Sequence, residues 1–263
     1  MSEPQIRFDD GAAYERMMGV WSRLAGEIFL EWVAPRPGLR WIDVGCGNGA
    51  FTELLVSRCA PAEVQGIDPS EGQLSFARSR PAARVAQFHQ GDAMALPFPQ
   101  GRFDAAVMAL VIFFVPNPTK GVAEMIRVVS PGGIVVAYAW DILGGGFPNP
   151  IPDELRAMGR KPPLPPSVDV SRIDALRGLW TDGGLESVET REITVHRTYV
   201  DFDDLWTTSL SGSSIRPMVE AMSAEDREQL RSRLRARLPA DAAGRVTYSG
   251  RANAIKGRVP VKV

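Results

Sequence analysis

The chain has 263 residues, and its 30 Lys and Arg against 31 Asp and Glu give a formal net charge of -1. This balance argues against nonspecific electrostatic binding to nucleic acid or to an anionic membrane. Hydrophobic residues make up 44% of the sequence and charged residues 23%, which is typical of a globular protein and excludes a disordered one. Two cysteines, Cys46 and Cys59, are too few for a disulfide framework, and no Cys/His cluster predicts a metal site.

The chain lacks the patterns of exported or membrane-spanning proteins. Residues 1–10 are polar and do not have the basic-then-apolar layout of a signal peptide. The longest apolar run, residues 105–115, is shorter than the roughly 20 residues that a transmembrane helix needs. We therefore expect a cytoplasmic protein without a membrane span, built on one sizeable core with appended elements.

Apolar residues at helical spacing predict one or two helices over residues 14–33, before a Pro/Gly break at 35–38. Strands and helices then alternate. Strands are predicted at 39–44, 63–67, 84–88, 103–109 and 134–139, and helices at 50–59, 70–80 and 118–129. This alternation predicts a doubly wound α/β sheet, mostly parallel and covered on both faces, with its ligand site at the carboxyl ends of the strands.

The pattern weakens after residue 140. Residues 141–166 are rich in Gly and Pro, with one helix predicted around 153–160. Further helices are predicted at 173–180, 203–210 and 217–238, and strands at 187–199 and 245–255. The two late strands bring the predicted sheet to seven.

The first predicted strand runs into a glycine-rich turn, with the sequence WIDVGCGNG at residues 41–49. Glycines allow positive φ and let a ligand approach the backbone. The spacing differs from the dinucleotide fingerprint G-x-G-x-x-G, and Asp43 would repel a pyrophosphate there. The motif therefore favours a ligand with a positively charged amino group, or else it is a tight strand-to-helix turn that binds nothing.

The next two strands also end in acids. Asp68 can accept hydrogen bonds from both hydroxyls of a ribose, or it can cap the helix that begins near Ser70. Asp92 can accept from the exocyclic amine of adenine while the Ala93 amide donates to a ring nitrogen, or Asp92 can simply form a turn. Acids at the ends of three successive strands point to one ligand site more strongly than any single acid does.

With these motifs, residues 41–139 resemble the class I S-adenosylmethionine-dependent methyltransferase family, in its branch that includes ubiquinone and menaquinone biosynthesis methyltransferases. The resemblance implies a Rossmann-like, seven-stranded fold, with S-adenosylmethionine as cofactor, S-adenosylhomocysteine as product and no metal. It implies a single structural domain with N-terminal helices over the site at 1–34 and a cofactor-binding core at 35–140. The rest, 141–263, supplies the remaining strands and helical cap segments at about 141–166 and 203–238.

The resemblance also implies which residues hold the methionine end of the cofactor. Gly45, Cys46 and Gly47 wrap the methionine part, and Asp43 supports that loop and the amino group. The backbone at Met108 and Ala109 lies near the methionyl end.

The implied contacts to the nucleoside come from the next two loops. Asp68 binds the ribose hydroxyls, and Pro69 and Gln73 flank the adenine. Asp92 and Ala93 read the adenine edge.

The acceptor side is less defined. The apolar stretch 109–116 offers no general base and lacks the Asn/Asp-Pro-Pro-aromatic motif of DNA amino-methyltransferases. A base is needed only where the nucleophile keeps its proton at neutral pH, so we predict a small acceptor that is apolar or carries a soft or ionised nucleophile. Aromatic residues are the candidate acceptor contacts, although each can instead be core packing: Tyr14, Trp21, Phe113 and Trp140.

Other features favour structural roles. His89 and His196 lie in predicted strands, and residues 227–237 form an arginine-rich helix with a narrow leucine stripe. We interpret this helix as an exposed cap element, with contact to an anionic acceptor or RNA as the alternative. A cofactor-binding protein without turnover and an RNA or protein methyltransferase stay open as other functions. We expect no DNA partner, and the glycine spacing with the third acid disfavours a nicotinamide-dependent oxidoreductase.

Overall fold

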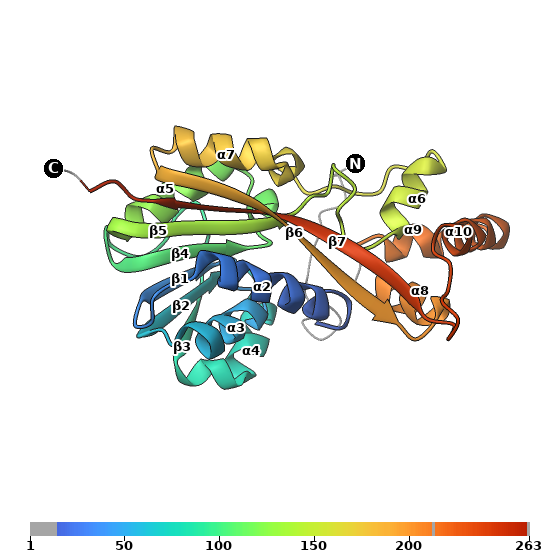
Figure 1. Ribbon diagram of the computed structural model, residues 1–263, viewed down its shortest axis with the longest axis horizontal. Helices are drawn as coiled ribbons and strands as arrows, with labels where there is room; N and C mark the ends of the chain where they lie inside the picture. Colours follow the sequence, from blue (N-terminus) through green and yellow to red (C-terminus); the bar gives the residue numbers. More distant parts are fainter. Residues whose placement is uncertain (1–14, 212–213, 262–263) are drawn as a thin grey trace.

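The computed structural model describes residues 15–211 and 214–261 (Figure 1). Within them, seven strands form one sheet in the order β3-β2-β1-β4-β5-β7-β6. The strands are β1 (Arg40–Val44), β2 (Glu63–Asp68), β3 (Ala86–Gln90), β4 (Phe103–Ala109), β5 (Val129–Trp140), β6 (Glu186–Tyr199) and β7 (Val246–Arg258). From β3 to β5 every neighbouring pair is parallel, whereas β7 runs antiparallel to both its neighbours. The predicted doubly wound, mostly parallel fold is confirmed.

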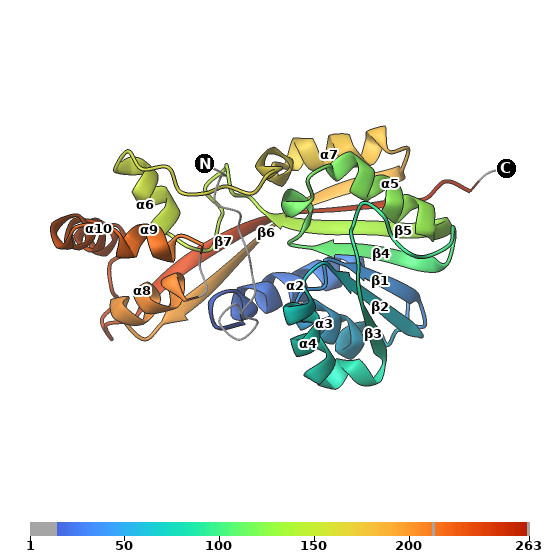
Figure 2. The same cartoon turned by 180° about the vertical axis from the view of Figure 1, so that it is seen from behind.

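Helices cover both faces of this sheet (Figures 1 and 2). One face carries α2 (Val20–Val33), α3 (Ala50–Cys59) and α4 (Glu71–Ser79), and the other carries α5 (Pro118–Val128) and α7 (Ile173–Asp182). Strand β4 lies between the two layers, and its residues Ala105 to Met108 are fully buried. A strand that is buried on both faces has a nearly continuous apolar sequence, and this is why the strand at 103–109 could be predicted.

The helices after the parallel strands begin at defined caps. The Ser70 side chain accepts a hydrogen bond from the Gln73 amide, 3.4 Å, at the start of α4, and Asn117 accepts from the Lys120 amide, 3.0 Å, at the start of α5. The cap at Ser70 fixes the turn that directly follows Asp68.

A helical cap lies beyond the carboxyl ends of the parallel strands, beside the far end of β6 and β7 (Figure 1). It comprises α6 (Ile151–Ala157), α8 (Phe202–Leu210), α9 (Arg216–Glu220) and α10 (Ala224–Arg237). Glu154 of α6 is buried between Arg233 and Arg237 of α10, with 3.2 Å to Arg237. Because this carboxylate is shielded from water, the two ion pairs fasten α10 to α6.

Two predicted elements differ from the structure. The single helix expected at 217–238 is two helices, because Ser223 interrupts it and caps α10 by accepting from the Asp226 amide, 3.0 Å. Strand β5 begins at Val129 rather than near Ile134, since a register shift opposite Phe103 and Ala105 absorbs the Pro-Gly-Gly segment. No helix in the described ranges is long and apolar enough to cross a membrane.

Candidate active site

The glycine-rich loop after β1 is held tightly against its surroundings. Gly45 has a φ of +76°, and the amides of Gly45 and Cys46 both donate to the Ile67 carbonyl, at 2.7 and 3.0 Å. A Cβ on Gly45 would lie 2.5 Å from two methyl carbons of Val111. Glycine is therefore required at this position both by the backbone conformation and by the lack of space.

Gly45→Ala is expected to lower the free energy of unfolding by about 2–4 kcal/mol, since it adds a left-handed strain and a clash. The matched control is Gly145→Ala, because Gly145 has the same φ of +76° but nothing within 4 Å of an added Cβ. Urea unfolding should show a smaller loss for Gly145→Ala, and Val111→Ala should restore part of the stability of the Gly45 variant. Equal losses at both glycines would contradict the close contact with Val111.

Asp43 is a fully buried carboxylate at the carboxyl end of β1. Its Oδ2 accepts a hydrogen bond from Thr52 Oγ1, 2.6 Å, whereas Oδ1 has no hydrogen-bond partner among the described residues. Burial raises the pKa of Asp43 to about 7, against the opposing effect of the Thr52 hydrogen bond and with a smaller contribution from the charge of Asp68. A buried carboxyl group with one unpaired oxygen suits a cationic ligand group.

Asp68 ties the first two loops together. Its Oδ2 accepts from the Gly47 amide and its Oδ1 from the Ser70 amide, both at 2.9 Å. Burial raises the pKa of Asp68, and the two backbone hydrogen bonds oppose that rise. Because each carboxylate oxygen has two acceptor positions, Asp68 can still accept two hydroxyl hydrogens.

A cavity of about 970 Å³ lies at the carboxyl ends of β1, β2, β3 and β4. Most of the residues predicted to hold a cofactor line it: Asp43, Gly45, Cys46, Gly47, Asp68, Pro69, Gln73, Asp92, Ala93 and Ala109. Met108 is not among the lining residues and is fully buried, because alternate residues of a strand face opposite sides and its neighbour Ala109 takes the cavity side. The structure thus brings the three strand-end acids to one cavity.

The cavity also has walls that the sequence motifs do not indicate. Ser22 of α2, Phe51 of α3 and Tyr138 of β5 contribute to the lining. Of these residues, only Tyr138 stands near the end of a predicted strand, where the ligand site is expected. The helix residues reach the cavity through packing that no local pattern specifies.

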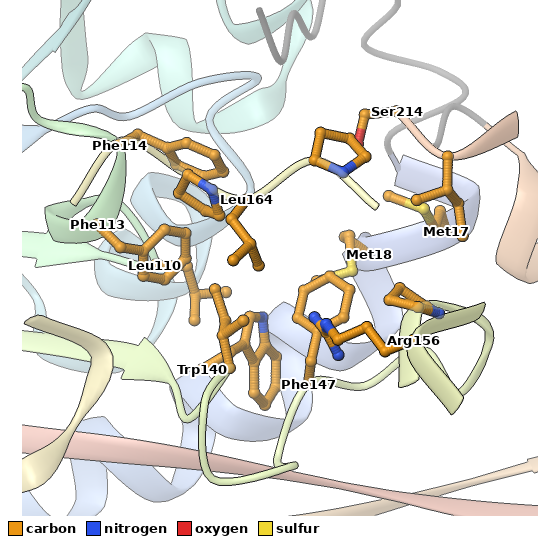
Figure 3. Close-up of a pocket in the computed structure, with 15 residues that line it drawn as sticks. Met17, Met18, Leu110, Phe113, Phe114, Trp140, Phe147, Arg156, Leu164 and Ser214 are labelled. Atoms are coloured by element: carbon orange, nitrogen blue, oxygen red, sulfur yellow. The ribbon is translucent and has the colours of Figure 1, made fainter. Parts of the chain in front are cut away.

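A second, apolar pocket of about 80 Å³ adjoins the first, and both share Leu110, Phe114 and Leu164 (Figure 3). The remaining residues that line it are Met17, Met18, Phe113, Trp140, Ile142, Phe147, Pro152, Arg156, Pro163, Pro165, Ser214 and Ile215. The pocket is therefore formed by the start of the described chain, the loop after β4, the end of β5, the 141–166 segment and residues 214–215.

Two of the four aromatic residues predicted to contact an acceptor, Phe113 and Trp140, line this apolar pocket. Trp21 lines neither cavity: it is buried next to Trp140, with ring centroids 6.5 Å apart, and its Nε1 donates to the Tyr199 hydroxyl, 3.3 Å. Tyr14 lies outside the described residues.

Neither histidine lines a cavity. His89 Nε2 lies 2.6 Å from Gln65 Oε1, and the His89 ring contacts Phe98 edge-on. His196 is exposed on β6. Within the described residues, no group of three or more His, Cys, Asp or Glu could hold a metal ion.

Comparison with known families gives a match at this part of the chain. Residues 42–137 match the family described as a methyltransferase domain. Over this range the chain is therefore similar to methyltransferase domains. The matched range begins in β1 and ends in β5, so it holds all three strand-end acids and the glycine-rich loop.

Curated relatives are similar to part of the chain. The chain is 36% identical over 113 residues to a demethylmenaquinone methyltransferase of Desulfitobacterium hafniense, which is 41% of this chain and 45% of the relative. It is 34% identical over 139 residues to a ubiquinone/menaquinone biosynthesis C-methyltransferase of Cereibacter sphaeroides, 51% of this chain and 54% of the relative. The chain thus spans about half the length of the relatives it matches.

Solved structures share the fold over nearly the whole chain. The YcgJ protein of Bacillus subtilis has a TM-score of 0.60 at 17% identity and covers 90% of this chain and 99% of its own. Phosphoethanolamine N-methyltransferase 2 of Haemonchus contortus, in complex with S-adenosyl-L-methionine, has a TM-score of 0.56 at 18% identity, over 95% of this chain and 56% of its own. The strands and helices outside residues 42–137 therefore belong to the same architecture.

Proposed function

We propose that this protein transfers a methyl group from S-adenosylmethionine to a small apolar acceptor held in the apolar pocket. One observation carries the proposal: the cavity with the strand-end acids and the apolar pocket share the wall formed by Leu110, Phe114 and Leu164. A cofactor in the first space and an acceptor in the second would meet at this wall.

The first cavity fits the cofactor in size and chemistry. Its volume of about 970 Å³ lies in the upper part of the range for small-molecule sites, roughly 300–1,000 Å³. Asp43 would offer its unpaired buried oxygen to the amino group, Asp68 would offer acceptor positions to the ribose hydroxyls, and Asp92 and Ala93 on the same cavity would contact the adenine edge. The glycine-rich loop would let the methionine end approach the backbone.

Methyl transfer from a sulfonium is an in-line displacement in which the nucleophile bonds to the methyl carbon as the carbon–sulfur bond breaks and sulfur keeps the electron pair. The protein contributes mainly by aligning the two reactants, an effect worth roughly 7–11 kcal/mol in well-oriented systems. Because neither histidine reaches the described walls, the arrangement suits a nucleophile that is already ionised or soft. Relatives named for menaquinone and ubiquinone biosynthesis support a quinone-type ring as the acceptor.

The proposal is tested by turnover. The purified protein is incubated with S-adenosylmethionine labelled in its methyl group and with the organic-soluble fraction of a cell extract. We expect labelled organic product and an equal amount of S-adenosylhomocysteine, both lost in Asp68→Ala. Tight cofactor binding without S-adenosylhomocysteine formation in any fraction would favour a cofactor-binding protein without turnover.

The arginine-rich helix α10 does not favour an RNA acceptor. Arg231 and Arg235 both contact Asp203, at 2.6 and 3.2 Å, and Arg233 and Arg237 both contact Glu154. Together with Glu225, Asp226 and Glu228 of α10 itself, these two carboxylates balance the charge of the helix's five arginines.

We expect the wild type to elute from heparin below physiological salt concentration, because these ion pairs leave little net positive charge for a polyanion. Asp203→Asn removes the carboxylate shared by Arg231 and Arg235 and should elute later. The measurement is the elution salt concentration of both proteins on one column. Salt-sensitive retention of the wild type well above physiological salt concentration would instead support RNA as the methyl acceptor.

A further inference from the structure

Trp140, at the end of β5, buries a hydrogen-bond donor without a partner. The side chain is 1% exposed, and its Nε1 has no hydrogen-bond partner among the described residues. A buried N–H that has given up its water and gained no acceptor is costly, so most proteins pair such groups. An orphaned donor on a pocket wall therefore points to an acceptor that arrives with a ligand.

Two other buried indoles of this protein are paired. Trp180 Nε1 donates to the Val135 carbonyl, 2.9 Å, and Trp21 Nε1 to the Tyr199 hydroxyl, 3.3 Å. Trp41 Nε1 is also without a partner in the described chain, but Trp41 lines neither of the two cavities. Of the two orphaned indoles, only that of Trp140 stands on a pocket, where Figure 3 shows its nitrogen on the ring edge toward Leu110 and the pocket interior.

Few polar side chains line this pocket. Besides Trp140, the described lining carries the Arg156 guanidinium, which only donates, and the Ser214 hydroxyl, which can donate or accept, and it includes no carboxylate, carboxamide or imidazole. Arg156 already forms an ion pair with Asp153. Because Trp140 Nε1 pairs with no described group, Ser214 included, the acceptor left for this N–H is one that a ligand brings.

We infer that Trp140 Nε1 donates a hydrogen bond to an oxygen of the methyl acceptor and so selects apolar molecules that carry a carbonyl or phenolic oxygen. The inference rests on the proposed function, because it assigns the apolar pocket to the methyl acceptor. The pocket of about 80 Å³ is smaller than most ligand sites, so the acceptor has to displace part of the wall. Leu164, 43% exposed and shared by both cavities, is a part of this wall that faces solvent.

Indole NMR tests this hydrogen bond directly. The protein, with its six tryptophans labelled with ¹⁵N and with S-adenosylhomocysteine bound, is titrated with acetophenone and with α-methylstyrene, in which a CH₂ group replaces the carbonyl oxygen. The Trp140 and Trp41 signals are assigned from Trp140→Phe and Trp41→Phe. We expect acetophenone to move the Trp140 N–H signal downfield, α-methylstyrene to leave it nearly in place, and the Trp41 signal to stay fixed with both.

Affinities give the second measurement. Acetophenone should bind the wild type about five- to tenfold more tightly than α-methylstyrene, and Trp140→Phe should remove that advantage, whereas Trp41→Phe keeps it. Equal binding of both probes, no binding of acetophenone, or an unmoved Trp140 signal would each overturn the inference, and the wild-type affinities for the two probes decide even if Trp140→Phe is unstable. The same samples report cofactor binding: if S-adenosylhomocysteine binds and Trp140 stays silent, only this inference fails, whereas absent cofactor binding removes the proposed function.

Discussion

Asp68→Ala is expected to weaken binding of S-adenosylmethionine and S-adenosylhomocysteine about 10- to 100-fold in a calorimetric titration. The substitution removes the acceptor positions proposed for the ribose hydroxyls, and hydrogen bonds to a charged group contribute roughly 1.5–3 kcal/mol. It also removes the anchor of the Gly47 and Ser70 amides, which each lie 2.9 Å from the carboxylate. The loss therefore combines a direct contact with a loosened loop.

Two further variants separate these effects. Asp68→Asn keeps one side-chain oxygen as an acceptor and should retain part of the affinity. Asp104→Ala removes a carboxylate at the start of β4, where Asp104 binds Arg40 at 2.9 Å and lines neither cavity, so cofactor affinity should be unchanged. Undiminished binding by a folded Asp68→Ala, or an equal loss in Asp104→Ala, would contradict the role given to Asp68.

The second large effect is a dependence of cofactor affinity on pH. The pKa of Asp43 is raised to about 7 by burial, so below neutral pH the free protein holds this carboxyl group mostly protonated. A cationic amino group beside Asp43 favours the ionised form, and binding at acidic pH then has to release this proton. We expect the affinity for S-adenosylhomocysteine to be about tenfold lower at pH 5.5 than at pH 7.

Asp43→Asn is the control, because it keeps the shape and removes the titration. Its affinity should be lower than that of the wild type at pH 7 and nearly constant from pH 7 to pH 5.5. The protein without ligand shows the opposite trend: the folded pKa of Asp43 lies above the unfolded value of 3.8, so its contribution to stability is present at low pH and is lost as pH rises toward 7. The melting temperature of the wild type should therefore fall relative to that of Asp43→Asn as pH rises from 4 to 7. A difference in melting temperature that stays constant over this range would contradict the raised pKa of Asp43.

The cofactor side of the site could be predicted from the sequence because its residues lie in local motifs. Asp43, Asp68 and Asp92 lie at or just beyond the ends of three successive strands, and parallel strands bring their carboxyl ends to one edge. The expectation that the ligand site lies at the carboxyl ends of the strands identified the loop residues. It did not show which strand residues face the cavity, so it did not separate Ala109, on the cavity, from Met108, in the core.

The acceptor side could be predicted only in part. Its pocket combines Met17 and Met18, the loop after β4, the end of β5 and the 141–166 segment, and no spacing in the sequence links these parts. An aromatic residue at helical spacing gives the same sequence pattern whether its side chain lines a pocket or, like that of Trp21, packs behind the pocket wall. The ion pairs of Glu154 with Arg233 and Arg237, which fasten the cap, likewise join residues that no local pattern connects.

The measurement that tests the central claim most directly is a calorimetric titration of the wild type with S-adenosylmethionine, S-adenosylhomocysteine and NAD. We predict saturable binding of both S-adenosyl compounds, near one molecule per chain. We predict no binding of NAD, because the Asp43 carboxylate would repel a pyrophosphate at the glycine-rich loop. A well-folded protein that binds neither S-adenosyl compound, or that binds NAD instead, would contradict these predictions, and the methyltransferase proposal would then be abandoned.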